Sequence, residues 1–237
     1  MTCPETAPHG VQAVYEDADL LVLHKPAGLL CVPGRGPDKQ DCLSARAQQR
    51  WPGALIVHRL DQATSGLVLM ARHIDAQRRL SQAFAERQVH KRYQAVVQGC
   101  LMRKGDGKDD GGDDEGGPWH EISLPIGADW ERRPLRVIDH AKGKPSVTRW
   151  CTLPPRNGQA GRPDTGTTRV ELEPVTGRTH QLRVHMAAIG HAILGDALYA
   201  DAATQALSPR LLLHACQLAF THPATGEPVC MHLPADF

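Results

Sequence analysis

The chain has 237 residues, 41% of them hydrophobic and 22% charged, which is the composition of a soluble globular protein with room for one large domain or two small ones. Its longest apolar runs, such as Leu20–Leu23, are far shorter than the roughly 20 residues of a membrane-spanning helix, and residues 1–10 lack the apolar segment of a secretory signal. The formal net charge of +1 is unevenly distributed, because residues 103–117 hold six acids and three bases. The rest of the chain is therefore mildly basic, which is compatible with an anionic partner.

The N-terminal part predicts a hairpin followed by a short helix. We expect residues 1–10 to form a flexible tail. Val11–Tyr15 and Leu20–Leu23 are rich in β-forming residues and predict two paired strands. After a loop rich in Pro and Gly, Asp41–Trp51 predicts a short helix that is capped by its first residue and ends before a proline.

A polar loop with one carboxylate separates the next two apolar runs. Residues His58–Gly66 read His-Arg-Leu-Asp-Gln-Ala-Thr-Ser-Gly and lie between the strand-like runs Leu55–Val57 and Leu67–Met70. Loops held by rigid strands are frequent places for catalytic groups. An ordinary turn in which Asp61 bonds to the backbone has the same composition, so the loop alone leaves both interpretations open.

The middle of the chain predicts a stronger helix, a basic strand and an insertion. Asp75 is expected to cap the helix, in which Leu80 and Phe84 lie one turn apart on the apolar face. A basic run then leads into a strand at 90–97. Residues 103–117 are rich in Gly and Asp and have no apolar anchor, so we expect a surface insertion without a catalytic part.

The C-terminal half predicts short strands and one more helix. Basic residues gather within 119–150, namely Arg132, Arg133, Arg136, Lys142 and Lys144. After a flexible loop at 157–167, a helix is expected at 179–189, with an apolar stripe of Leu182, Met186 and Ile189 and with Gly190 as its αL cap. The irregular order of strands and helices favours an α+β fold over a doubly wound sheet.

Cysteine and histidine spacing gives no metal site. The seven cysteines are scattered without a Cys-x-x-Cys pair, which indicates reduced thiols in a cytoplasmic protein. His180, His185 and His191 lie five and six residues apart and match no His-Glu-x-x-His motif. We therefore expect no metal ion.

Three sequence motifs are more informative together than each is alone. They are His58-Arg-Leu-Asp61-x-x-Thr-Ser-Gly66, Lys91-Arg92-Tyr93-x-Ala-x-Val and Gly177-Arg-Thr-His-Gln-Leu-Arg183-Val-His. Together they resemble the RluA family of RNA pseudouridine synthases, and the resemblance extends over residues 11–237. Further stretches agree with it, namely Lys25-Pro-Ala-Gly28, Gly143-Lys-Pro145, Leu194-Gly-Asp196 with Tyr199, and Leu213-His-Ala215.

The resemblance implies an α+β fold with a central mixed, mostly antiparallel sheet flanked by helices and loops. It implies one catalytic domain at 11–237, with 103–117 as an insertion and without a separate N-terminal RNA-binding domain. Within the family, the chain is most similar to the member that acts on both 23S ribosomal RNA and the anticodon stem-loop of transfer RNA. The implied enzyme is a monomer whose partner is RNA. Because the isomerisation of uridine to pseudouridine needs no redox step and no group donor, no cofactor is expected.

The implied reaction breaks the N1 glycosidic bond, turns the uracil and rejoins the sugar through C5, and the target base must first leave its stack. By the resemblance, Asp61 attacks C1′ or C6 or takes a proton from the sugar, and these three routes stay open. A carboxylate in a closed pocket needs a cation to stay ionised, and the resemblance makes Arg183 this cation. Tyr93 is expected to stack on the displaced uracil and to serve in proton transfer at C5.

Five further residues are expected to contact RNA. Arg59 is expected to fill the gap left by the flipped base or to bind a neighbouring phosphate. The others are His58, Arg178, Gln181 and Lys91. Each of the five also has an ordinary interpretation as a surface or core residue.

Other functions stay open on the residues alone. One is a non-catalytic RNA-binding homologue, which the loss of Asp61 or Tyr93 would favour, although both residues are present. Another is a metal hydrolase built from the histidines, which chelators would inactivate. A third is the same enzyme acting on one of the two RNAs and not on both.

Overall fold

The computed structural model of the chain describes residues 10–101, 118–155 and 166–237. The predicted insertion at 103–117, nearly all of the predicted N-terminal tail and most of the predicted loop at 157–167 lie outside the described residues.

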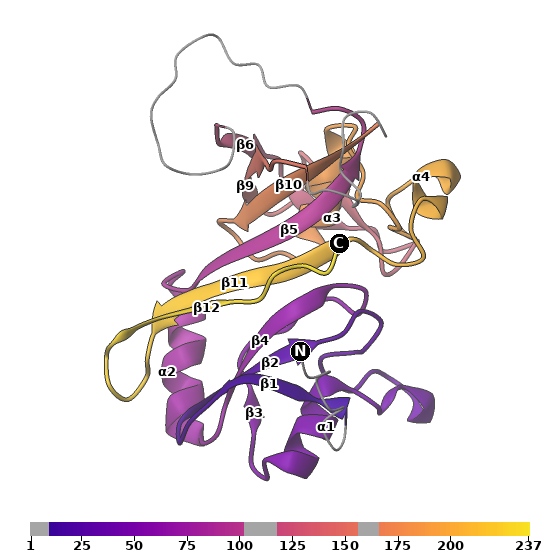
Figure 1. Cartoon of the computed structure of the whole chain (residues 1–237). Helices are drawn as coiled ribbons and strands as arrows, with labels where there is room; N and C mark the ends of the chain where they lie inside the picture. Colours follow the sequence, from indigo (N-terminus) through magenta and orange to yellow (C-terminus); the bar gives the residue numbers. More distant parts are fainter. Residues whose placement is uncertain (1–9, 102–117, 156–165) are drawn as a thin grey trace. The chain divides into compact units, whose positions relative to one another are not determined.

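The chain forms two compact units (Figure 1). The first contains the chain up to Lys91 together with Ala215–Ala235, and the second contains Arg92–His214 with the last two residues. Two strands therefore continue from one unit into the other, one at Lys91 and one at Ala215. The single catalytic domain at 11–237 stays a prediction.

The first unit is built on a sheet whose assigned strand pairs are antiparallel. Its strands are β1 (Gln12–Glu16), β2 (Leu20–Lys25), β3 (Leu55–Ile56), β4 (Ser65–Ala71), β11 (Leu213–Thr221) and β12 (Pro228–His232). The order is β1-β2-β4-β11, with β12 beside β11 and β3 beside β4. The predicted hairpin of the first two strands is confirmed, since Gln12 lies opposite His24 and Glu16 opposite Leu21.

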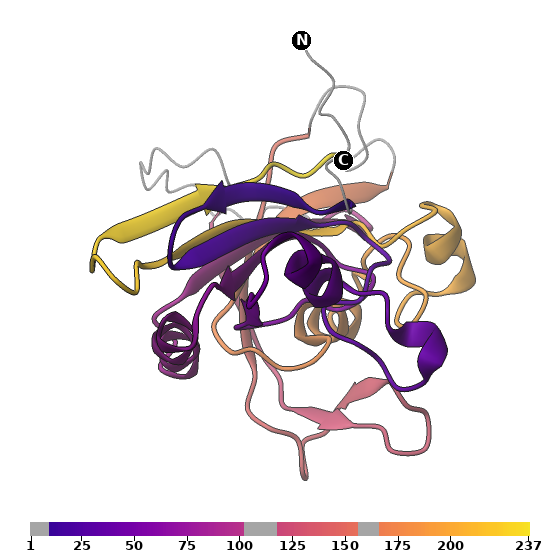
Figure 2. The same cartoon turned by 90° about the horizontal axis from the view of Figure 1, so that it is seen from below.

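The hydrophobic core of this unit is formed by its central strands and one helix. Leu20 and Val22 of β2 pack with Leu67 and Leu69 of β4, and Leu80 of the helix joins them. Every residue of β4 is buried, as expected for a strand that is covered on both faces. Figure 2 shows the helices of this unit on one face of its sheet.

The helices of the first unit lie where the sequence predicts them, but their caps differ. They are α1 (Leu43–Arg50) and α2 (Ile74–Ala85), preceded by the short 3-10 turn η2 (Pro37–Lys39). Asp41 does not cap α1, because its carboxylate binds Arg46, and the thiol of Cys42 caps the helix. Asp75 does not cap α2 but lies in its first turn, and the ring of His73 provides the cap.

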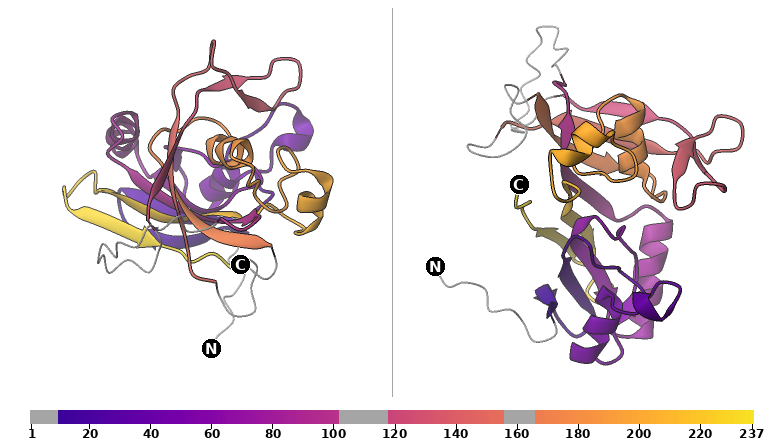
Figure 3. Two further views of the ribbon diagram at one scale, coloured as in Figure 1. Left: turned by 90° about the horizontal axis from the view of Figure 1, so that it is seen from above. Right: turned by 90° about the vertical axis from the view of Figure 1, so that its right-hand side faces the viewer.

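The second unit has its own antiparallel strands. They are β5 (His90–Gln98), β6 (His120–Ser123), β9 (Val147–Thr152) and β10 (Thr167–Pro174), in the order β5-β10-β9-β6. A separate hairpin consists of β7 (Ile126–Ala128) and β8 (Arg136–Ile138). The hairpin extends away from β9 and β10 (Figures 2 and 3).

The helices of the second unit are α3 (Gln181–Ala188) and α4 (Ala202–Ala206). Gly190 follows α3 with a φ of 84°, so the predicted αL residue is confirmed. The predicted single stripe is wrong, because the six consecutive residues Gln181–Met186 are all buried. Since α3 contacts β8, β9 and β10, it has no broad solvent face, and Arg183 is buried rather than at the edge of a stripe.

The fold is α+β with a mixed, mostly antiparallel sheet, as predicted. The strand pairs named above are antiparallel, while an isolated parallel bridge joins Leu30 to Cys42. Across the described residues, no helix combines the length and the apolar content that crossing a membrane requires.

Gly66, at the start of β4, is the glycine on which the sheet of the first unit depends most. Its φ is 118°, and a Cβ built there would lie 2.3 Å from the carbonyl oxygen and 2.5 Å from the nitrogen of Ala215. A side chain is therefore excluded by both conformation and space. Residue 66 is also the end of the loop that carries Asp61.

We expect Gly66→Ala to lower the free energy of unfolding by about 3 kcal/mol, because strain at positive φ adds to a backbone clash. Urea unfolding followed by circular dichroism measures this change. Gly226→Ala is the matched control, since Gly226 has a φ of 76° but no atom within 4 Å of the added Cβ. Equal effects of the two substitutions would show that the contact with Ala215 does not matter.

Candidate active site

Asp61 lies in a turn held at both ends by paired strands. Ile56 of β3 lies opposite Met70 of β4, so the two ends of the loop belong to one ladder. The amide of Thr64 donates to the carbonyl of Asp61 at 3.1 Å and closes the turn. Thr64 is buried and Asp61 is half-buried. The carboxylate therefore projects from a backbone with little freedom.

The buried ammonium of Lys25 ties a second loop to this turn. Its Nζ donates to the carbonyls of Pro26 at 2.9 Å, Leu29 at 2.7 Å and Gln62 at 3.0 Å. The amide of Gly28 also donates to the carbonyl of Gln62, at 2.9 Å. Because Gln62 directly follows Asp61, the Lys-Pro-Ala-Gly turn fixes the backbone beside the carboxylate.

Lys25 also supplies positive charge near Asp61. Burial lowers the pKa of Lys25 to about 8, while electrostatic interactions with Cys31 and Asp61 act in the opposite direction. With this pKa the ammonium remains mostly protonated at pH 7. Burial also raises the pKa of Cys31, whose thiol accepts a hydrogen bond from the Leu60 amide at 3.1 Å.

Sequence reasoning did not assign Lys25 a role in the site. It used the Lys25-Pro-Ala-Gly28 stretch as one of the supporting motifs and gave the lysine no partner. The motif was the available signal, but a lysine with no solvent exposure is rare and its burial depends on tertiary contacts.

His58 has a structural place in the first unit. Its ring stacks on Phe84 with centroids 4.6 Å apart, and its Nε2 accepts a hydrogen bond from the Leu69 amide at 3.0 Å. Burial lowers the pKa of His58 to about 3, and the charge of Lys91 adds to this effect. His58 is therefore neutral at pH 7, and its contact with RNA stays a prediction without support from this geometry.

The other two expected RNA contacts of the first unit differ in exposure. Arg59 is exposed and precedes the Asp61 turn by two residues. Lys91 is half-buried, with its Nζ 5.9 Å from the centroid of the Phe84 ring, and burial lowers its pKa. Arg59 is thus better placed to meet a phosphate than Lys91.

Tyr93 lies in β5 of the second unit, opposite Leu172 of β10. The residue is buried, with 9% of its surface exposed. Its backbone is held by the sheet, and stacking of its ring on a base stays a prediction.

Arg183 is held by a carboxylate that sequence reasoning did not select. Its Nε donates to Oδ2 of Asp196 at 2.8 Å, and its Nη2 donates to Oδ1 at 2.5 Å. The side chains are 4% and 0% exposed. The Leu194-Gly-Asp196 stretch was quoted as a supporting motif without this role. The expected contact of Arg183 with Asp61 stays a prediction.

Tyr199 connects this ion pair to neighbouring elements. Its amide donates to Asp196 at 3.2 Å, and the guanidinium carbon of Arg183 lies 5.1 Å from its ring centroid. Its hydroxyl accepts from the amide of Arg136 at 2.9 Å and lies 2.7 Å from Nδ1 of His180. His180 has a φ of 58°, which is unusual for a residue other than glycine and often accompanies a functional site.

The two remaining predicted contacts, Arg178 and Gln181, lie at the N-terminal end of α3. Gln181 is buried, and its amide group makes four hydrogen bonds, to the Thr176 hydroxyl, the Arg178 amide, the Val147 carbonyl and the Thr148 hydroxyl. A contact between this side chain and RNA would break one of them, so the contact stays a prediction that the geometry does not favour. The side chain of Arg178 is exposed and suited to a phosphate.

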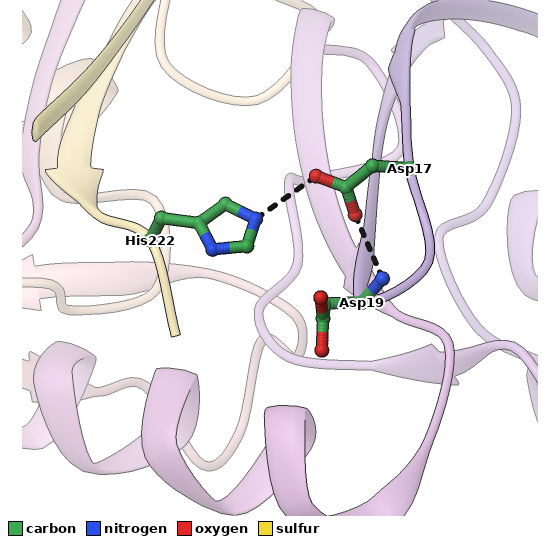
Figure 4. A group of neighbouring side chains, drawn as sticks. All are labelled: Asp17, Asp19 and His222. Carbon is green, nitrogen blue, oxygen red and sulfur yellow. Dashed lines mark hydrogen bonds and ion pairs between the residues drawn. The ribbon is translucent and has the colours of Figure 1, made fainter. Parts of the chain in front are cut away.

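One group of possible metal ligands occurs among the described residues, and it is not the histidine set considered from the sequence. Figure 4 shows Asp17, Asp19 and His222 in the first unit. Two backbone amides donate to Nδ1 of His222, which leaves its proton on Nε2, directed at Asp17 at 2.9 Å. Asp19 likewise binds His73 at 2.9 Å. The group is a closed hydrogen-bonded cluster rather than an open set of ligands.

The same cluster explains the ionisation of Asp17. Burial acts to raise the pKa of Asp17, but hydrogen bonds from the Leu20 amide, His222, the Asp19 amide and Tyr15 outweigh it and lower the pKa to about 2. Asp17 is therefore a charged anchor of the β1–β2 turn.

The predicted site residues fall into two groups. Asp61, His58, Arg59 and Lys91 belong to the first unit, together with Lys25. Tyr93, Arg178, Gln181 and Arg183 belong to the second, together with Asp196 and Tyr199. Each group is internally ordered, and the meeting of Asp61 with Tyr93 and Arg183 stays a prediction.

Comparison with known proteins identifies the family. The model of the family described as RNA pseudouridylate synthase matches residues 19–188. The chain is 42% identical over 224 residues to the dual-specificity RNA pseudouridine synthase RluA of Yersinia pestis, which covers 94% of this chain and 98% of that protein. It is 43% identical over 234 residues to the protein of the same name in Pasteurella multocida, covering 99% and 97%.

Solved structures agree. Human RNA Pseudouridylate Synthase Domain Containing 1 superposes with a TM-score of 0.72 at 29% identity, over 99% of this chain and 86% of that one. Human RNA Pseudouridylate Synthase Domain Containing 4 shares the fold, with a TM-score of 0.66 at 23% identity over 94% and 88% of the two chains. The chain therefore belongs to the RNA pseudouridylate synthase family.

Proposed function

We propose that this protein isomerises specific uridines to pseudouridine in structured RNA, with 23S ribosomal RNA and the anticodon stem-loop of transfer RNA as its substrates. The observation that carries the proposal is the ordered Asp61 turn in a chain more than 40% identical, over nearly its full length, to enzymes named for dual specificity. We further propose that it acts in the cytoplasm as a monomer and needs no cofactor.

The reaction defines what the site must supply. The N1–C1′ bond breaks and a C5–C1′ bond forms, while C5 loses a proton and N1 gains one, so atoms and electrons balance without a redox partner. Attack at C1′, attack at C6 and removal of a sugar proton all require an ionised carboxylate. Asp61 takes this role, and its fixed turn orients the carboxylate before the substrate arrives.

The residues of the second unit serve the displaced base. The uridine leaves its stack, Tyr93 stacks on the uracil and its hydroxyl takes part in the proton transfer at C5. Arg183 supports the charge of Asp61, and the bidentate grip of Asp196 holds its guanidinium in one orientation. Arg59 and Arg178 are exposed and bind RNA, Arg59 at the place that the base leaves.

Lys25 makes the turn of Asp61 a fixed element. Three carbonyls share its ammonium, and one of them belongs to Gln62. Its charge lies near enough to Asp61 for the carboxylate to act on the pKa of the lysine. Lys25 is thus a positioning residue for the Asp61 turn.

Asp61→Asn is expected to lower pseudouridine formation at least about 1000-fold, because it removes the reactive charge with almost no change of shape. Primer extension after carbodiimide treatment measures the product, and RNA binding and unfolding by urea test whether the variant is otherwise intact. Asp38→Asn, at an exposed acid of η2, is the control and should keep full activity. Full activity of Asp61→Asn would refute the assignment.

Arg183→Ala is expected to lower the turnover number about 100-fold, because Asp61 loses its supporting cation. The substitution also leaves buried Asp196 unpaired, which destabilises the protein. The double variant Arg183→Ala with Asp196→Ala removes this stranded charge and should regain stability but not activity. An unchanged turnover number in the single variant would contradict the proposed pairing.

Lys25→Met is expected to lower the free energy of unfolding by about 3 kcal/mol, since the hydrogen bonds that tie the carbonyls of Pro26, Leu29 and Gln62 to the buried ammonium are lost. Urea unfolding measures the loss, and Lys39→Met at an exposed lysine is the control. In the fraction that stays folded at low temperature, the turnover number should fall as well. A variant as stable and as active as the parent would show that the ammonium is dispensable.

A further inference from the structure

The β7–β8 hairpin carries the most exposed aromatic side chain among the large hydrophobic residues that the structure describes. Trp130 is 71% exposed, whereas the hairpin is anchored by buried Ile126. An exposed tryptophan offers a large, rigid aromatic face to a partner. None of the roles proposed above uses this side chain.

The tip of the hairpin is ordered. The amide of Asp129 donates to the carbonyl of Leu135 at 3.2 Å, and the amide of Leu135 donates to the carbonyl of Arg132 at 2.9 Å. The carboxylate of Asp129 accepts from the amide and the side chain of Arg132. The turn between Asp129 and Leu135 therefore presents Trp130 outward from a fixed backbone.

One guanidinium lies over the indole. The guanidinium carbon of Arg133 lies 4.3 Å from the centroid of the Trp130 ring and covers part of it. The charge of Arg132 is matched by Asp129. Glu131 is the exposed acid of the same turn, and Arg133 makes no ion pair with any described residue. The tip thus combines an aromatic face with one guanidinium that no described carboxylate neutralises.

We infer that Trp130 is a stacking platform for an unpaired nucleotide of the substrate RNA, with Arg133 binding its phosphate. The inference deepens the proposed function and rests on it. An exposed aromatic ring with neighbouring cations is the chemistry that recognises single-stranded nucleic acid, because each base offers a stacking face and each phosphate a negative charge. A-form duplex RNA offers no such face along its length, so the occupant is a loop or flanking nucleotide.

The hairpin is connected to Arg183 within the second unit. The Arg136 amide, at the first residue of β8, donates to the hydroxyl of Tyr199, whose ring lies against Arg183. A nucleotide bound at the hairpin tip is therefore bound to the scaffold that positions Arg183. The platform sets the register of the RNA and takes no part in the chemical step.

Binding of an anticodon stem-loop RNA tests the inference. Trp130→Ala should raise the Kd about 10-fold and the KM with it while the turnover number stays unchanged, and Trp130→Phe should retain most of the affinity. Glu131→Gln on the same turn is the control, with binding at least as tight as that of the parent. The same RNA with abasic loop nucleotides should bind the parent and Trp130→Ala equally.

Three results would overturn the inference. They are equal binding of the intact RNA by the parent and Trp130→Ala, the same loss with the abasic RNA, and a change in oligomeric state of Trp130→Ala in sedimentation, which would make the tip a protein interface. Failure of the proposed function is a separate result, since the parent would then form no pseudouridine whatever the effect of Trp130 on binding.

Discussion

A single buried ammonium fixes the backbone from which the proposed reactive group projects. Lys25 has no solvent exposure, and its charge is satisfied by three carbonyls of the chain. Burial of a charge is costly, and it lowers the pKa of Lys25 to about 8. The ammonium can stay buried when all three carbonyls converge on it, so the loop after β2 and the turn after Asp61 have to keep one arrangement. This constraint fixes the backbone of the polar loop that carries Asp61.

In the second unit, a buried charge is compensated by an ion pair. Arg183 and Asp196 are almost fully buried and joined by two hydrogen bonds, and further amides bind the carboxylate. A buried pair of this kind adds little net stability, but it penalises every arrangement in which one partner is missing. Its value here is therefore orientation. In both units, a cation proposed to act near the reacting atoms is fixed before RNA binds, which is what electrostatic stabilisation of a reaction requires.

The sequence predicts the strands and the polar loop well because local signals determine them. Apolar runs mark β1, β2 and β4, and the loop of Asp61 lies between two such runs as expected. The predicted helix caps are wrong because other side chains compete for the expected capping residue. Asp41, for example, accepts a hydrogen bond from Arg46. The predicted apolar stripe on α3 is wrong because strands surround the helix. The helix α4 has only five residues, too few to show a helical period of apolar residues. The roles of Lys25 and Asp196 depend on tertiary burial, and no local pattern reports burial of a charge.

Tyr199 shows how recognition and chemistry are joined in the second unit. Its amide and ring belong to the surroundings of Arg183 and Asp196, while its hydroxyl receives the Arg136 amide and meets His180. His180 is held at positive φ, a conformation that persists when several contacts determine it together. The hairpin, the first turn of α3 and the buried ion pair therefore share one side chain. If Trp130 holds a nucleotide as proposed, the RNA is positioned relative to Arg183 by rigid connection through Tyr199, and no conformational change is needed to transmit that position.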